Sequence, residues 1–252
     1  MRPTEFLVLV IVGAVAAAIN TVAGGGSLIS YPVLTLVYRF PSRESNASNS
    51  VALWPGSLAG ALGYLSYLAR TGRYFKVFIG PTILGSMMGA WLLTISSQTA
   101  FNRIVPFLIL TAAVMLVLQP RIKKRAEQAG GLPTWVGLFI QFLVAIYGGY
   151  FGAGMGIMML GAFALTMEGD IHELNAVKNW LGLFINLIAS VVFFLKGMVN
   201  LEIALPLMLG CVCGGYASAR ISQQFNPEKL RLVISIYGFS MAAYYFYSAF
   251  IA

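Results

Sequence analysis

The sequence is poor in charged residues. Of its 252 residues, 10% are charged and 59% are hydrophobic, whereas about a quarter of an ordinary soluble domain is charged. Its mean hydropathy is +0.82. Apolar runs, each near the ~20 residues that cross a ~30 Å hydrocarbon layer, lie at about 6–38, 46–69, 75–96, 103–119, 135–166, 174–196, 201–220 and 231–251. Because these runs are continuously apolar rather than alternating, they predict an all-α integral membrane protein instead of a membrane barrel.

Carboxylates, histidine and cysteine are also scarce. The eight Asp and Glu residues include a single Asp, and all lie near the ends of apolar runs, so no deep acid can relay protons or sodium. The paired Asp residues of an intramembrane aspartyl protease and the G-x-S-G motif of a rhomboid-like protease are both missing. His172 is the only histidine, and we expect it in a surface loop. Cys211 and Cys213 are two residues apart in one helix and point to different faces, so we expect them to form no disulfide and no metal site. We also expect no enzyme activity and no cofactor.

The basic residues indicate orientation. The formal charge of +8 comes from Lys and Arg at the ends of the runs, including Arg70, Arg73 and Lys76 in one joint and four residues of 121–125 in another. Basic residues that flank membrane helices follow the positive-inside bias. We therefore expect both joints to face the cytoplasm, in a multi-pass protein of the cytoplasmic membrane that binds no nucleic acid.

The chain repeats itself. With an offset of 129, NASNS at 46–50 aligns with NAVKN at 175–179, and GGG at 24–26 falls within GGYFGAGMG at 148–156. The pattern predicts a first transmembrane repeat over 1–120, a basic cytoplasmic linker over 121–134 and a second repeat over 135–252, with four segments in each repeat. Paired, glycine-interrupted segments at equivalent places mark the binding site of many secondary transporters.

The first segment of each repeat, 6–38 or 135–166, is too long for one straight crossing. We expect each to consist of two half-helices that meet at the glycines. If these segments turn back, three crossings remain in each half, the halves are inverted, and both termini lie outside. If they cross once, the halves are parallel. The inverted arrangement is favoured because it leaves more basic residues inside.

Backbone groups freed by a helix break inside a membrane must be packed in protein or line a polar cavity. Freed amides at a helix N-terminus favour an anion, and Lys178, about two turns into its helix, is a candidate counter-charge, with snorkelling to the interface as the alternative. Pairs such as Gly85 with Gly89, and Gly210 with Gly214, are typical of close helix packing. The predicted substrate-binding residues are Asn20, Thr21, Gly24, Gly25, Gly26, Ser27, Asn46, Asn49, Ser57, Gly152, Gly154, Gly156, Asn175, Lys178, Asn179 and Asn186.

The sequence also resembles a known family. AGGGSLISYPVL at 23–34 and ASNSVALWPGSLAGALGY at 47–64, with a weaker echo in GGYFGAGMGIMML and LNAVKNWLGLFINLIAS, are similar to the TauE/SafE family, named for sulfite exporters. The resemblance covers essentially the whole chain. It implies a carrier that exports sulfite or an organosulfonate such as sulfoacetate. The second half departs from the pattern by carrying Met155, Met158 and Met159 and by lacking an equivalent of Pro32.

The expected function is export of a small sulfur-containing anion by alternating access. Two alternatives stay open: an importer of sulfonates or other small anions with the same fold, and a non-transporting membrane assembly protein. The expected partners are a small anionic solute and the lipid bilayer, and a homodimer is left open.

Overall fold

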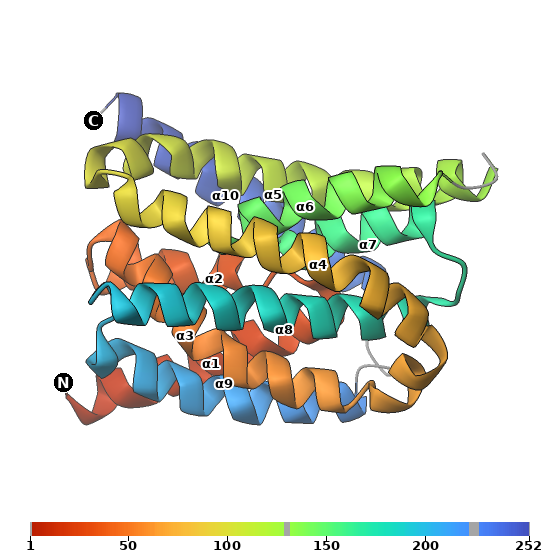
Figure 1. Ribbon diagram of the computed structural model, residues 1–252. Helices are drawn as coiled ribbons and strands as arrows, with labels where there is room; N and C mark the ends of the chain where they lie inside the picture. Colours follow the sequence, from red (N-terminus) through yellow and green to blue (C-terminus); the bar gives the residue numbers. More distant parts are fainter. Residues whose placement is uncertain (1, 129–131, 222–226, 252) are drawn as a thin grey trace.

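The computed structural model describes residues 2–128, 132–221 and 227–251, and in them it contains helices but no strands. The helices are α1 (Pro3–Ala23), α2 (Ser27–Pro32), the π-helical turn η1 (Val33–Val37), α3 (Ser42–Leu62), α4 (Leu65–Ile95), α5 (Gln98–Gln128), α6 (Thr134–Tyr150), α7 (Met155–Thr166), α8 (Ile171–Leu195), α9 (Leu201–Ile221) and α10 (Pro227–Phe250). They pack into one elongated bundle (Figure 1). The prediction of an all-α membrane protein is confirmed, since six of these helices are long and apolar enough to cross a membrane.

The remaining long helix, α3, is polar but runs through the bundle beside the others (Figure 1). Its first half holds buried Ser and Asn residues at 45, 46 and 48–50. Helix α3 packs against α8 and α9, so its polar side chains face protein instead of lipid. A helix of this composition is tolerated at membrane depth because its neighbours supply hydrogen-bond partners.

Both glycine-interrupted segments are broken and turn back. Helices α1, α2 and η1 form the first hairpin, and α6 and α7 form the second. Gly24 ends α1 with a left-handed φ of +80°, and Gly152 and Gly154 have φ of +80° and +77° between α6 and α7. At the open end of the first hairpin the Tyr38 hydroxyl donates to the Glu5 carbonyl over 3.0 Å. At the open end of the second, the Leu132 amide donates to the Leu165 carbonyl over 2.6 Å. Each hairpin therefore enters and leaves at one end of the bundle.

The two hairpins enter from opposite ends, and α1 begins at the same end at which α10 finishes (Figure 1). We call this the terminal end. Three further helices in each half run the length of the bundle. Five of the sixteen basic residues belong to the terminal end, namely Arg2, Arg39, Arg43, Arg103 and Lys196. Ten belong to the opposite end, namely Arg70, Arg73, Lys76, Arg121, Lys123, Lys124, Arg125, Arg220, Lys229 and Arg231.

The positive-inside bias predicts that the terminal end lies outside the cell. The inverted arrangement of the two halves stays a prediction. The duplication itself and the domain boundaries at 121 and 134 stay predictions.

Two predicted joints are wrong in their extent. The chain turns at Gly63 and Tyr64, so the second apolar run ends at Leu62, and the basic stretch 70–76 lies inside α4. Likewise, residues 121–128 of the predicted linker continue α5, while 129–131 lie outside the described residues. Lys, Arg, Glu, Gln and Ala are good helix formers, so the backbone stays helical through these basic stretches.

Small residues let helices of the two halves approach closely. A methyl group at Gly89 of α4 would lie 2.0 Å from the Ile146 carbonyl oxygen of α6, and one at Gly214 of α9 would lie 2.0 Å from that of Ala14 in α1. The packing role predicted for the glycine pairs is confirmed. Cys211 is buried and Cys213 is exposed, as expected for two positions on different faces of one helix.

Candidate functional site

The tips of the two hairpins meet inside the bundle. A methyl group on Gly24, in the first tip, would lie 2.6 Å from the Cα of Gly156, in the second. Only glycine allows such a backbone approach, and the positive φ of Gly24 also favours glycine. The matched breaks thus form one feature, in which the C-terminus of α1 faces the N-terminus of α7.

Lys178 reaches this junction from α8. Its side chain is 2% exposed, which rules out snorkelling in this conformation. The ammonium donates to the Thr21 carbonyl over 2.8 Å and to the Asn20 carbonyl over 3.4 Å. These carbonyls belong to the last turn of α1, which carries partial negative charge. The Asn20 carbonyl also accepts from the Gly24 amide over 2.9 Å, so the ammonium is the cap mainly of the Thr21 carbonyl. Lys178 therefore caps a half-helix of the other half of the chain.

Two asparagines of α3 also form hydrogen bonds with the broken segments. The Asn46 amide donates to the Tyr150 carbonyl, at the C-terminus of α6, over 3.0 Å. The Asn49 amide donates to the Ser27 hydroxyl, at the start of α2, over 3.1 Å. The polar starts of α3 and α8 therefore stabilise the helix breaks. Asn46 of α3 caps α6, and Lys178 of α8 caps α1.

A small cavity lies at the junction. It is lined by Asn20, Thr21, Gly24, Ser57, Met155, Gly156, Met159, Lys178, Asn179 and Gly182. Its volume is about 10 Å³, close to the smallest space that holds one water molecule. The cavity is thus in a closed conformation and must widen before it can hold an oxyanion.

The lining of this cavity offers positive charge and an unpaired hydrogen-bond donor. Among the described residues, Lys178 is the only charged one that lines it, and no carboxylate of theirs does. The side-chain nitrogen of Asn179 is buried and has no hydrogen-bond partner among the described residues. Because an unpaired buried donor costs free energy, the site favours a ligand that brings an acceptor and a negative charge.

Seven of the sixteen predicted site residues line the cavity, and nine do not. Asn186 donates to the cavity residue Ser57 over 3.2 Å, whereas Asn175 donates to the Ile171 carbonyl of its own helix. Predicted residues that do not line the cavity are Gly25, Gly26, Ser27, Asn46, Asn49, Gly152, Gly154, Asn175 and Asn186.

Three lining residues were missed: Met155, Met159 and Gly182. Helical spacing could have identified them. Gly182 is four residues after Lys178, and Met159 is four residues after Met155, so each pair shares a helix face.

Asp170 and Glu173 have the sequence spacing of a capping box, and the box is formed at the start of α8. Asp170 accepts hydrogen bonds from the amides of His172 and Glu173 over 2.7 and 2.9 Å, and the Glu173 carboxylate accepts from the Asp170 amide over 3.1 Å. This capping box fixes the first turn of α8. His172 lies in that turn, stacked on Tyr67, and not in a loop. In the described ranges no three His, Cys, Asp or Glu side chains are grouped to hold a metal ion.

Comparison with known proteins agrees with this architecture. The family described as Sulfite exporter TauE/SafE matches residues 9–245. A probable membrane transporter protein of Haemophilus influenzae is 25% identical over 236 residues, covering 94% of this chain and 92% of its own. The probable membrane transporter protein YfcA of Escherichia coli K12 is 25% identical over 99% of this chain and 92% of its own.

A relative from a Gram-positive bacterium shows the same relationship. The probable membrane transporter protein YunE of Bacillus subtilis is 24% identical, over 92% of this chain and 94% of its own. No solved structure matches. Since the family match spans nearly the whole chain, with both hairpin tips and the cavity inside it, this membrane transporter belongs to the TauE/SafE sulfite exporter family.

Proposed function

We propose that the protein is a secondary transporter that exports a small sulfur-containing anion, sulfite or an organosulfonate such as sulfoacetate, by alternating access. One observation carries the proposal. At the junction of two broken hairpins, a buried lysine is the only charged residue in a cavity that no carboxylate lines. The substrate class comes from the family's description, and the charge of the site agrees with it.

The proposed binding step uses groups that the junction already holds. The anion takes a position beside the Lys178 ammonium, accepts a hydrogen bond from the Asn179 amide, and faces the N-terminus of α7, whose partial positive charge favours an anion. The amides of Met155 and Ile157 already donate to the Gly152 and Gly154 carbonyls, so the helix contributes mainly this charge. The ammonium is then shared between the anion and the α1 carbonyls, which it contacts in the closed cavity. Charge-assisted hydrogen bonds of this kind are about twice as strong as neutral ones.

The proposed direction follows from the membrane potential. An inside-negative potential drives an anion outward with about 2.3 kcal/mol per charge per 100 mV. Export therefore needs no coupling ion, and no acidic residue lines the cavity to bind one. An importer would need such an ion, so dependence of uptake on a pH gradient is the outcome that favours this alternative.

Binding can be tested on the purified protein. We expect millimolar sulfite to raise its melting temperature, because a ligand that binds only the folded state stabilises it by ~2.7 kcal/mol at 100 times Kd. Chloride at equal ionic strength is the control. If the chain is instead a non-transporting assembly protein, no solute should stabilise it, so equal melting temperatures with sulfite, sulfoacetate and chloride would reject the binding step.

The other proposed partner is the lipid bilayer, and the homodimer remains a prediction.

A further inference from the structure

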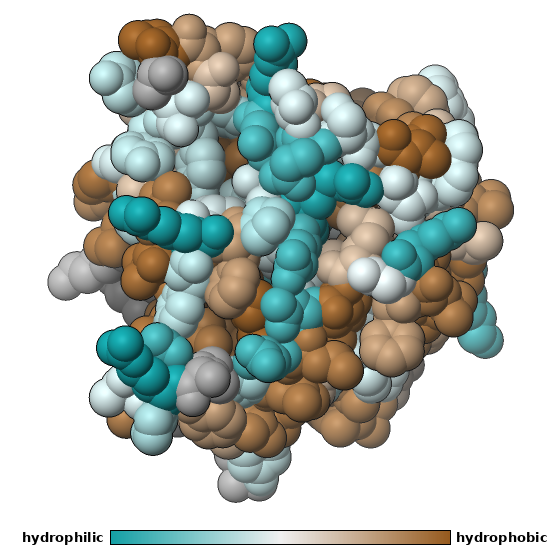
Figure 2. Space-filling model, turned by 90° about the vertical axis from the view of Figure 1, so that its left-hand side faces the viewer, coloured by the Kyte–Doolittle hydropathy of each residue, from teal (hydrophilic) through white to brown (hydrophobic). Residues whose placement is uncertain are grey.

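We propose that a second cavity, at the terminal end, is an outer vestibule that binds the same anion before its release; the inference rests on the proposed function. This cavity lies between η1, α5 and α10, and its volume is about 370 Å³. That volume falls in the range of small-molecule sites. Figure 2 looks onto this end of the molecule, where hydrophilic side chains form a band between apolar margins.

The lining of the vestibule matches an anion. Among the described residues that line it, Arg103 is the only charged one, and Thr35, Ser42 and Ser248 add hydroxyl groups to the lining. Arg103 forms no ion pair within the described part of the chain. A guanidinium offers several donors in a planar fork that suits oxyanions, and hydroxyl groups can donate to the remaining oxygens. The vestibule thus repeats the chemistry of the inner cavity on a larger, more open scale.

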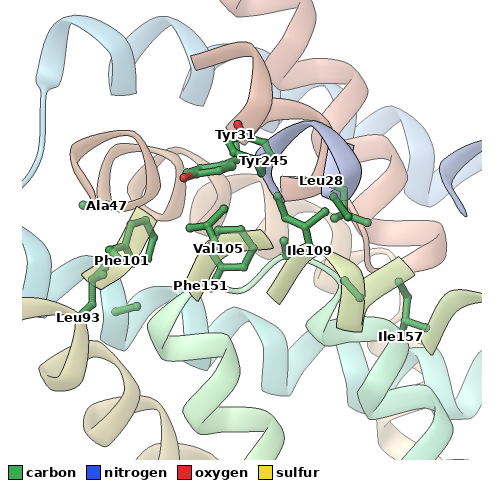
Figure 3. Packing of buried hydrophobic residues seen from close by; sticks show 14 of the residues in the cluster. Leu28, Tyr31, Ala47, Leu93, Phe101, Val105, Ile109, Phe151, Ile157 and Tyr245 are labelled. Atoms are coloured by element: carbon green, nitrogen blue, oxygen red, sulfur yellow. The ribbon is translucent and has the colours of Figure 1, made fainter. Parts of the chain in front are cut away.

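A buried donor at the floor of the vestibule has no partner. The Tyr31 side chain is 1% exposed, and its hydroxyl makes no hydrogen bond of normal geometry with a described residue. Ser42 lies close enough to interact with it only weakly. By contrast, the neighbouring Tyr245 hydroxyl is paired with Thr35. Figure 3 shows the Tyr31 and Tyr245 rings next to each other, close to Val105 and Phe151. An anion oxygen within reach of Tyr31 would satisfy this donor.

The Tyr31 ring at the floor of the vestibule also separates the vestibule from the cavity at the hairpin tips. Tyr31 packs edge to face on Phe151, with ring centroids 5.1 Å apart, and Phe151 directly precedes Gly152 in the second hairpin tip. A solute that passes from the tips to the terminal end must cross this aromatic layer. The vestibule therefore lies on the outer side of a barrier whose inner side is the junction of the hairpins.

Sided transport tests the vestibule. In vesicles of known orientation, external unlabelled sulfite is varied while exchange with labelled internal sulfite is measured. We expect Arg103→Gln to raise the external half-saturating concentration about fivefold, the factor for roughly 1 kcal/mol, and to leave the internal value unchanged. Tyr31→Phe keeps the aromatic layer, removes the hydroxyl and should act in the same direction. Arg2→Gln, an exposed charge at the same end, is the matched control.

The outcomes separate the vestibule from the proposed function. Unchanged external values in both Arg103→Gln and Tyr31→Phe would overturn the vestibule while export stands, and so would an equal change in the internal value. Failure of the unmodified protein to exchange any sulfur anion would overturn the proposed function. In that case anion binding to the vestibule is tested with sulfate and phosphate. Both anions should raise the melting temperature of the unmodified protein more than that of Arg103→Gln. Equal stabilisation would reject it.

Discussion

Replacing Gly156 with alanine is expected to lower sulfite efflux at least about tenfold. The new methyl group would lie 2.7 Å from the Cα of Gly24 and 3.3 Å from the Lys178 side chain. Neither hairpin tip can yield without moving its backbone, and overpacking of this kind costs about 1–3 kcal/mol, so the tips should separate and the cavity lose its shape. Initial efflux rates and the melting temperature measure the two effects.

Gly161→Ala provides a matched control on the same helix. No atom lies within 4 Å of a methyl group at Gly161, and alanine is favoured over glycine in a helix by about 1 kcal/mol. We expect this variant to transport normally and to melt at the same or a higher temperature. Equal effects of the two substitutions would mean that contact between the tips does not matter to transport.

Lys178→Met should abolish transport and leave the protein folded. Methionine fills a similar volume and removes the desolvation cost of the ammonium, but it leaves the Thr21 carbonyl without the donor that caps it. Loss of a buried charge-assisted contact to the anion costs about 2–5 kcal/mol. We therefore expect sulfite affinity to fall about a hundredfold, measured by sulfite-dependent thermal stabilisation, and the melting temperature without sulfite to fall only moderately.

Two further lysine variants separate binding from structure. Lys196→Met removes an exposed lysine at the far end of α8 and should have no effect on affinity. Lys178→Arg keeps the charge and should retain part of the binding. If Lys178→Met melts much lower but binds sulfite normally once folded, the role of Lys178 is to cap α1 and nothing more.

Local chemistry explains which parts of the fold could be predicted. Consecutive glycines beside Asn20 and Thr21 predict a break wherever an apolar segment is too long, and the Asp170 capping box identifies the start of α8. The glycine spacing on α4 and α9 predicts close packing, because it depends only on helix periodicity. These features are set by residues near one another in the sequence.

Tertiary contacts explain which parts could not be predicted. Lys178 looks like a free counter-charge in the sequence, yet its ammonium is held by carbonyls of residues 157 and 158 positions earlier. Asn46 and Asn49 look like cavity residues, but Asn46 caps the C-terminus of α6 and Asn49 donates to the Ser27 hydroxyl. Arg43 has no motif, but it donates to the Leu93 and Thr94 carbonyls at the end of α4. Partners of this kind depend on how the two halves dock.

Efflux of labelled sulfite from vesicles is the most direct test of the central claim, which is that an anion crosses through the Lys178 cavity. Vesicles that contain the protein are loaded with sulfite, and a potential negative on the cytoplasmic side of the protein is imposed. We predict efflux that the potential accelerates and that Lys178→Met abolishes, while Lys196→Met leaves it intact. Efflux that continues at the same rate in Lys178→Met, or no efflux of any sulfur anion from the unmodified protein, would contradict the account.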